Sequence, residues 1–284
     1  MNATTCLPQN GETISNLGPD FEAIKTKQRA TWGDGDYNVI GRSLQLVGET
    51  ICEAADVRGD ERVLDVAAGT GNAALAAARR WAQVTAADYV ESLLDRTRAR
   101  AEADGMELET RVADAESLPF EDGSYDKVLS TFGIMFAPNQ EKVAAELLRV
   151  CRSGGCVALA NWTPDGFIGE LFKVVGRHVP PPAGVKSAAL WGTEARLHEL
   201  FPASTAAVRI EEKDFVFRYR SPQHFVDVFR TYYGPVLRAF AALPEERREE
   251  LERDMLALIE RSNVATDGTC VIPGAYLEVV VTKQ

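Results

Sequence analysis

The sequence predicts an α/β fold in which a mostly parallel sheet carries helices on both faces. Two observations predict it: short apolar strands alternate with helices from Glu61 to Trp162, and a glycine turn, Gly69-Thr70-Gly71, joins the first of these strands to a helix. Strands that alternate with helices form right-handed βαβ units, and such units build parallel sheets. The chain is 45% hydrophobic, which is enough apolar material for one large core.

The elements up to Trp162 follow from apolar periodicity and from turn residues. Residues 20–58 are expected to be mostly helical, interrupted by the turn Gly33–Asp36. The expected strands are Val63–Ala67, Val84–Ala87, Glu107–Ala113, Tyr125–Thr131 and Cys156–Asn161. The expected helices between them are Asn72–Arg80, Glu91–Ala103 and Glu141–Arg152, the last closed by a left-handed cap at Gly154-Gly155.

Beyond Trp162 the regular alternation stops. The pattern predicts a helix at Glu194–Leu200, a strand at Val208–Tyr219, helices at Ser221–Leu243 and Glu245–Arg261, and a closing strand at Tyr276–Thr282. A long helical excursion between two late strands is where a substrate lid would lie.

Charge and cysteine content exclude several classes of partner. The net charge is −11 and no strong Lys/Arg cluster is present, so we expect no nucleic-acid partner. No apolar run approaches the roughly 18 residues that span a bilayer, and the first residues, MNATTCLPQNGETISN, read as a loose tail rather than a secretory signal. The five cysteines are scattered without a CxxC pair, which favours a reducing cytoplasm over a disulfide framework or a zinc site. A small-molecule ligand is therefore expected.

The glycine turn indicates a nucleotide site, but it allows two ligands. Gly69-Thr70-Gly71-Asn72-Ala73-Ala74 satisfies the dinucleotide fingerprint, with Asp88 at the offset that grips a ribose, so an NAD-dependent oxidoreductase is one alternative. Asp65, four residues before Gly69, would repel a pyrophosphate but would suit the ammonium group of a methionine moiety. Asp114 would accept from an adenine amino group while the Ala115 N–H donates to a ring nitrogen. These acids favour a sulfonium nucleoside.

Four motifs occur in order along the chain: VLDVAAGTGN (63–72), Ala87-Asp88-Tyr89, ADAESLPFEDGSYDKV (113–128) and LSTFGIMFAPNQEKVAAELLRVCRSGG (129–155). With them, the sequence resembles the class I S-adenosylmethionine-dependent methyltransferases over about residues 60–162. The resemblance is strongest to the bacterial small-molecule branch that includes ubiquinone and menaquinone methyltransferases. It implies a Rossmann-like fold with a seven-stranded sheet and a helical lid. It also implies S-adenosyl-L-methionine as cofactor and S-adenosyl-L-homocysteine as product.

The resemblance divides the chain into four parts. They are an N-terminal helical segment and tail (1–58), the S-adenosylmethionine-binding core (59–165), a lid and acceptor region with a late strand near 208–219 (166–264), and a C-terminal strand that completes the sheet (265–284).

The resemblance also implies roles for residues of the donor site. Gly69 and Gly71 would pass beneath the methionine part, Asp88 would bind the ribose hydroxyls, and Tyr89 would lie against adenine. The full expected donor site is Trp32, Tyr37, Asp65, Ala67, Gly69, Gly71, Asp88, Tyr89, Asp114, Ala115, Ser130 and Thr131, with the Ser130 or Thr131 backbone meeting the donor amino group.

The acceptor site is less defined by the sequence. His224 and Tyr233 are the candidate bases if the acceptor must lose a proton, whereas His178 and His198 are expected at the surface. An apolar acceptor wall is expected from aromatic and methionine side chains just beyond strand ends and in the lid, with core packing as the alternative: Phe132, Met135, Phe136, Trp162 and Tyr232.

The expected reaction is O-methylation of a small apolar or aromatic metabolite or natural product by in-line displacement. C-methylation of a quinol-like ring, carboxyl methylation of a peptide, and a non-catalytic S-adenosyl ligand-binding protein stay open as alternatives, and so does a homodimer. Ser130–Gly133 lacks the Asn/Asp-Pro-Pro-Tyr/Phe signature of amide and amine N-methyltransferases. No metal is expected, because the loop from Asp34 has Val39 and Gln45 where a calcium loop needs Gly and Glu.

Overall fold

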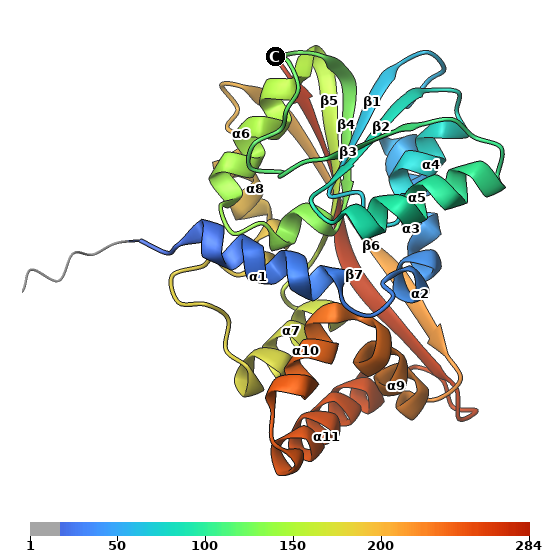
Figure 1. The fold of residues 1–284 in the computed structure, drawn as a ribbon, viewed down its shortest axis with the longest axis vertical. Coiled ribbons are helices and arrows are strands. Elements are labelled where there is room, and N and C mark those ends of the chain that lie inside the picture. Colours follow the sequence, from blue (N-terminus) through green and yellow to red (C-terminus); the bar gives the residue numbers. More distant parts are fainter. Residues whose placement is uncertain (1–17) are drawn as a thin grey trace, which may run out of the picture.

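The computed structural model describes residues 18–284, and at its centre lies a seven-stranded sheet with helices on both faces (Figure 1). The strand order is β3-β2-β1-β4-β5-β7-β6. The strands are β1 (Arg62–Val66), β2 (Gln83–Asp88), β3 (Glu109–Val112), β4 (Tyr125–Thr131), β5 (Cys151–Trp162), β6 (Ala206–Tyr219) and β7 (Cys270–Lys283).

The five strands from β3 to β5 are parallel, and the last two form an antiparallel hairpin. Near the centre of the sheet, the buried Val63 of β1 pairs with Val84 of β2 on one side and with Lys127 of β4 on the other. β7 runs antiparallel to both β5 and β6, so the sheet is mixed. The predicted mostly parallel, Rossmann-like fold is confirmed.

Helices cover both faces and one end of the sheet. Figure 1 shows α3, α4 and α5 on one face and α6 and α8 on the other, while α1, α7 and α9–α11 gather below the carboxyl ends of the parallel strands. The helices are α1 (Phe21–Gly33), α2 (Asn38–Gly41), η1 (Arg42–Leu44), α3 (Gln45–Ala54), α4 (Asn72–Ala78), α5 (Glu91–Ala103), η2 (Gly133–Phe136), α6 (Gln140–Val150), α7 (Phe167–His178), η3 (Ala188–Gly192), α8 (Glu194–Leu200), α9 (Pro222–Tyr232), α10 (Gly234–Ala242) and α11 (Glu245–Ser262).

The β6–β7 hairpin extends beyond the rest of the sheet. Each strand has 14 residues, but β5 pairs with β7 only from Tyr276 onward, so residues 270–275 pair with β6 alone. The chain between the two strands forms α9, α10 and α11 (Figure 1). The predicted helical excursion is therefore inserted at the far end of this hairpin.

Two predicted helix boundaries were wrong. The helix expected to close at Gly154-Gly155 ends at Val150, and these glycines lie in β5 where its register against β4 is broken, with Gly154 at φ +73°. The single helix expected over Ser221–Leu243 is broken at Tyr233, whose backbone is extended. Pro235 then starts a new helix, because proline lacks the N–H that a continuous helix would need there.

Two elements were missed or cut short. α7 was not predicted, although Phe167, Leu171 and Val174 bury one helical face. β7 begins six residues before the predicted Tyr276. The prediction missed these residues because proline and glycine, here Pro273 and Gly274, are disfavoured inside strands. None of the helices within residues 18–284 is long and apolar enough to cross a membrane. The tail expected at the first residues lies outside the described part of the chain.

Candidate functional site

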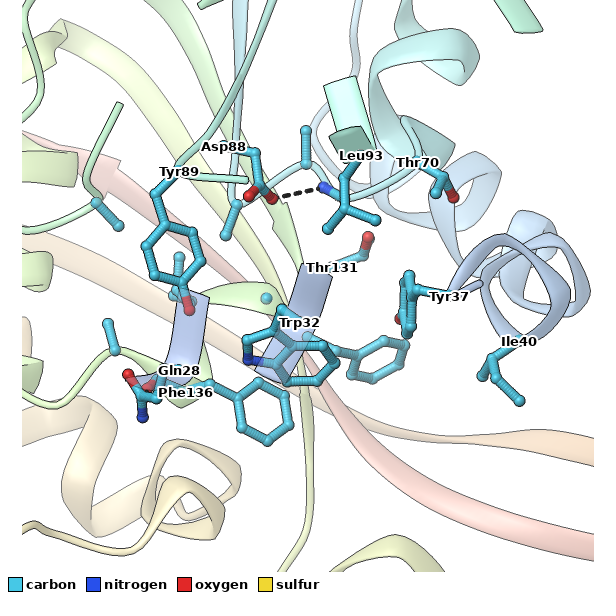
Figure 2. Close-up of a pocket in the computed structure, with 18 of the residues that line it drawn as sticks. Gln28, Trp32, Tyr37, Ile40, Thr70, Asp88, Tyr89, Leu93, Thr131 and Phe136 are labelled. Carbon is cyan, nitrogen blue, oxygen red and sulfur yellow. Dashed lines mark hydrogen bonds between the residues drawn. The ribbon is translucent and has the colours of Figure 1, made fainter. Parts of the chain in front are cut away.

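A cavity of about 1190 Å³, with its open mouth included, lies at the carboxyl ends of β1, β2 and β4. In open α/β sheets this edge is where ligands bind. Helix α1, with Gln28 and Trp32, lies across the cavity (Figure 2), and Ile168 of α7, Phe229 of α9 and Tyr233 complete the opposite wall. One end of the cavity is formed by the sheet loops and the other is aromatic.

The glycine turn after β1 forms the floor of the cavity near the sheet. Gly69 and Gly71 have φ of +56° and +86°, a conformation that glycine adopts without strain. The Thr97 hydroxyl of α5 donates to the Gly69 carbonyl at 3.1 Å and holds the turn in place. Gly69 and Ala67 line the cavity as predicted, whereas Gly71 faces Thr97 behind the wall.

Asp88, at the end of β2, ties that strand to the glycine turn. Its carboxylate accepts from the Gly69 N–H at 2.9 Å and from the Val90 N–H at 2.8 Å (Figure 2). Burial raises the pKa of Asp88 to about 6. Each carboxylate oxygen has a second lone pair, so a ribose hydroxyl would still find an acceptor here.

Asp65 lies behind the turn and is not part of the cavity wall. Its Oδ2 accepts from the Ala74 N–H at 2.9 Å, while its buried Oδ1 has no hydrogen-bond partner among residues 18–284. Burial, with a smaller contribution from the Asp88 charge, raises the pKa of Asp65 to about 7. An unpaired buried carboxylate oxygen fits a site that a cationic ligand completes, through an intervening water. Because Asp65 lies outside the wall, the expected interaction with a ligand ammonium would run through water rather than directly.

Ser130 and Thr131 are consecutive residues of β4, so their side chains point to opposite faces of the sheet. Thr131 lines the cavity, whereas the Ser130 hydroxyl is buried and donates to the Val66 carbonyl at 2.7 Å. Of these two residues, whose backbone was expected to meet the donor amino group, only Thr131 lines the cavity.

A lysine that was not predicted from the sequence contacts the residues expected to bind the edge of adenine. Tyr89, Asp114 and Ala115 line the cavity, but Lys25 of α1 donates to Asp114 Oδ2 at 2.6 Å. Lys25 is buried and also pairs with Glu116 at 3.4 Å. Although burial alone would lower it, hydrogen bonds to the carboxylates raise the pKa of Lys25 above its ordinary value.

Helix α1 contributes one wall of the cavity through Gln28 and Trp32. Gln28 Nε2 donates to the Phe136 carbonyl at 2.9 Å. The Trp32 ring lies 4.8 Å from Phe136, 5.7 Å from Tyr37 and 5.6 Å from Tyr233, measured between ring centroids. Trp32 and Tyr37 therefore lie between the two ends of the cavity (Figure 2).

The far end of the cavity is aromatic. Phe132 stacks on Trp162 with ring centroids 3.9 Å apart, and Phe136 lies beside them on the wall. Phe132 has φ +65°, and the following Gly133 approaches Ala67 so closely that a Cβ would collide with it. Such backbone strain is typical of functional sites. The predicted acceptor residues Phe132, Phe136 and Trp162 are thus brought together.

Three other predicted acceptor or catalytic residues do not line the cavity. Met135 is buried in the core, where its sulfur accepts from the Trp162 N–H at 3.3 Å. Tyr232 is not part of the cavity wall, whereas the adjacent Tyr233 is. His224 has both ring nitrogens beside Arg220, at 3.2 Å and 3.0 Å, and the geometry argues against its role as a base.

The remaining candidates are Tyr233 and the other histidines. Tyr233 lines the cavity, but burial raises its pKa, so its phenol stays protonated near neutral pH and does not act as a base. His198 is exposed as predicted, whereas the largely buried His178 ring bonds Asp254 at 2.9 Å. Residues 18–284 contain no group of three or more His, Cys, Asp or Glu side chains arranged to hold a metal.

Several further wall residues were not among those predicted for the site. They share an apolar or small polar character: Gln28, Ile40, Leu44, Thr70, Asn72, Leu93, Ile134, Ala137, Pro138, Ile168, Phe217 and Phe229. Apolar periodicity marks a buried helix face, but it does not distinguish a face that packs on the core from one that borders a cavity.

Comparisons with known proteins identify the family of the chain. A protein-family model described as a methyltransferase domain matches residues 63–155. An uncharacterized protein of Mycobacterium tuberculosis is 40% identical over 236 residues, which are 82% of this chain and 86% of that protein. Demethylmenaquinone methyltransferase of Thermus thermophilus is 36% identical over 153 residues, which are 51% of this chain and 70% of that enzyme.

The solved structure of the YcgJ protein from Bacillus subtilis has the same fold. It matches with a TM-score of 0.57 at 19% identity and covers 86% of this chain and 99% of that one. The sheet order, the four motifs and these matches agree, and the NAD alternative is set aside. The chain belongs to the class I S-adenosylmethionine-dependent methyltransferases and is an enzyme of that family.

Proposed function

We propose that this methyltransferase transfers a methyl group to an oxygen of a small aromatic or enolic acceptor. The observation that carries the proposal is the continuity of one cavity from the Asp88 end, which suits the donor, to the aromatic end around Phe132 and Trp162. S-adenosylmethionine, when bound, supplies an electrophilic methyl group on a leaving thioether that needs no acid.

The residues of the donor end fit this ligand. The Gly69 turn leaves the backbone open, Asp88 keeps free lone pairs for ribose hydroxyls, and Asp114 and Ala115 border the place for adenine. The main task of the chain is then to hold donor and acceptor in line and to exclude water. Such positioning contributes on the order of 7–11 kcal/mol to catalysis.

The aromatic end supports an acceptor that is already nucleophilic. Within residues 18–284, its wall contains no histidine, carboxylate, lysine or arginine that would remove a proton. Phenolic and enolic oxygens ionise without such a base, whereas aliphatic alcohols do not.

C-methylation of a quinol-like ring is the second candidate. The similarity to demethylmenaquinone methyltransferase favours it. An ionised phenol is nucleophilic at oxygen and at the neighbouring ring carbon, so the same cavity suits both reactions.

The test is to incubate the protein with isotope-labelled donor and a panel of phenols, hydroxyquinones and quinols, and to identify labelled products by mass spectrometry. We expect a labelled aromatic ether, or a ring-methylated product for the second candidate. Asp88→Ala should lower the labelling about tenfold or more when the donor is limiting, while Asp60→Asn, an exposed loop substitution, should retain it. S-adenosylhomocysteine binding without any labelled product would favour the non-catalytic alternative.

A further inference from the structure

Two tyrosine rings connect the donor end of the cavity to its aromatic end. Tyr37 precedes α2 and lies against the glycine turn, where a Cβ on Gly69 would be 3.5 Å from Tyr37 Cε1. Tyr233 lies at the break between α9 and α10, with its ring centroid 6.4 Å from that of Tyr37. Trp32 contacts both rings edge-on and fixes their positions.

The hydroxyl groups of these tyrosines are not used by the fold. Neither hydroxyl forms a hydrogen bond with any residue from 18 to 284. Burial and the Asp88 charge raise the pKa of Tyr37 to about 12, and burial and the nearby Tyr37 raise the pKa of Tyr233. Both phenols therefore stay protonated near neutral pH and are available only as hydrogen-bond donors or neutral acceptors.

The surroundings limit what these donors would bind. The other side chains at the aromatic end of the cavity are apolar. An ion placed at that end without hydrogen bonds would be strongly destabilised. Hydrogen bonds from neutral donors to an ionised oxygen are among the stronger ones in proteins. A pair of such donors in an apolar cavity is suited to one small anionic oxygen on a flat ring.

We propose that Tyr37 and Tyr233 together bind the ionised oxygen of the acceptor, and that they restrict the substrate to phenols and enols acidic enough to enter as anions. The inference rests on the proposed function and deepens it. The acceptor proton is released to solvent before binding, so no residue of the chain has to take it. Tyr37 and Tyr233 act as binding and specificity residues rather than as bases.

The test compares 4-nitrophenol with its methyl ether, 4-nitroanisole, as ligands of the protein saturated with S-adenosylhomocysteine. The two probes share a ring, but only the phenol ionises, and its phenolate absorbs visible light. We expect the wild type to prefer the phenol and to increase its phenolate absorbance at a pH where the free phenol is half ionised. Tyr37→Phe and Tyr233→Phe should each lower this preference about tenfold, as expected for a hydrogen bond to a charged group.

Tyr219→Phe is the matched control. Tyr219, at the end of β6, is also a tyrosine with a raised pKa, but its ring packs on Phe225 and does not line the cavity. This variant should keep the phenol preference, and thermal unfolding of all three variants shows that each is folded.

Three results would overturn the inference: both tyrosine variants keep the wild-type preference, the bound phenol becomes more protonated, or neither probe binds. These outcomes are separable from failure of the proposed function, because S-adenosylhomocysteine binding is measured first by calorimetry. A protein that does not bind S-adenosylhomocysteine contradicts the proposed function itself.

Discussion

Replacing Asp65 with asparagine should change how the stability of the ligand-free protein depends on pH. The Asp65 side chain is only 1% exposed and receives one hydrogen bond, from the Ala74 N–H. Its pKa is raised from 3.8 to about 7 by burial first and by the Asp88 charge second. Between these two pH values the folded protein therefore binds a proton at Asp65 that the unfolded chain has already released.

The sign of the effect follows from this difference in bound protons. Where the folded state holds more protons than the unfolded state, the free energy of unfolding falls as pH rises. The stabilisation by protonated Asp65 is complete below about pH 4 and is lost as pH rises to about 7. Its size is about 4 kcal/mol, since each unit of pKa difference corresponds to about 1.4 kcal/mol.

Urea unfolding of the wild type and of Asp65→Asn across this pH range measures the effect. The asparagine cannot ionise, so the variant should lose less stability with rising pH, and the difference between the two proteins should change by up to about 4 kcal/mol. Asp60→Asn is the control, because Asp60 is exposed and its left-handed backbone suits asparagine. Parallel pH profiles for wild type and Asp65→Asn would refute the reasoning.

Three further substitutions test other parts of the site. Lys25→Met should destabilise the protein by about 3 kcal/mol in chemical denaturation, because it leaves the partly buried Asp114 without its cation, whereas the exposed Lys27→Met should not. Asp88→Ala should weaken S-adenosylhomocysteine binding about tenfold or more in calorimetry, and equal affinity in the folded variant would contradict the ribose assignment. His224→Ala should leave turnover unchanged, and a large loss would restore His224 as a catalytic candidate.

The donor end was predictable because its residues are local in sequence. Asp88 ends a strand, Gly69 and Asp114 each follow one, and parallel strands bring their carboxyl ends to one edge of the sheet. The sequence therefore specified both the residues and their proximity. Lys25, which pairs with Asp114 from 89 positions away, carries no local signal of that contact.

The acceptor end was less predictable because neighbouring residues point in opposite directions. Phe136 borders the cavity while Met135 fills the core, and Tyr233 borders it while Tyr232 does not. A rotation of one residue in the short helix η2, or at the break before α10, would exchange each pair. Periodicity identifies apolar residues, but it does not fix the helix rotation or the position of a break to one residue.

The β6–β7 hairpin has a consequence for how new specificities arise. Tyr219 of β6 pairs with Cys270 of β7, so the two ends of the segment between them lie side by side at the end of the hairpin. Exchanging this segment, with Phe229 and Tyr233 of the cavity wall, need not disturb β1, β2 or β4, which form the donor end. Chimaeras joined at these two positions would change the preference for the acceptor and keep the donor-binding residues unchanged.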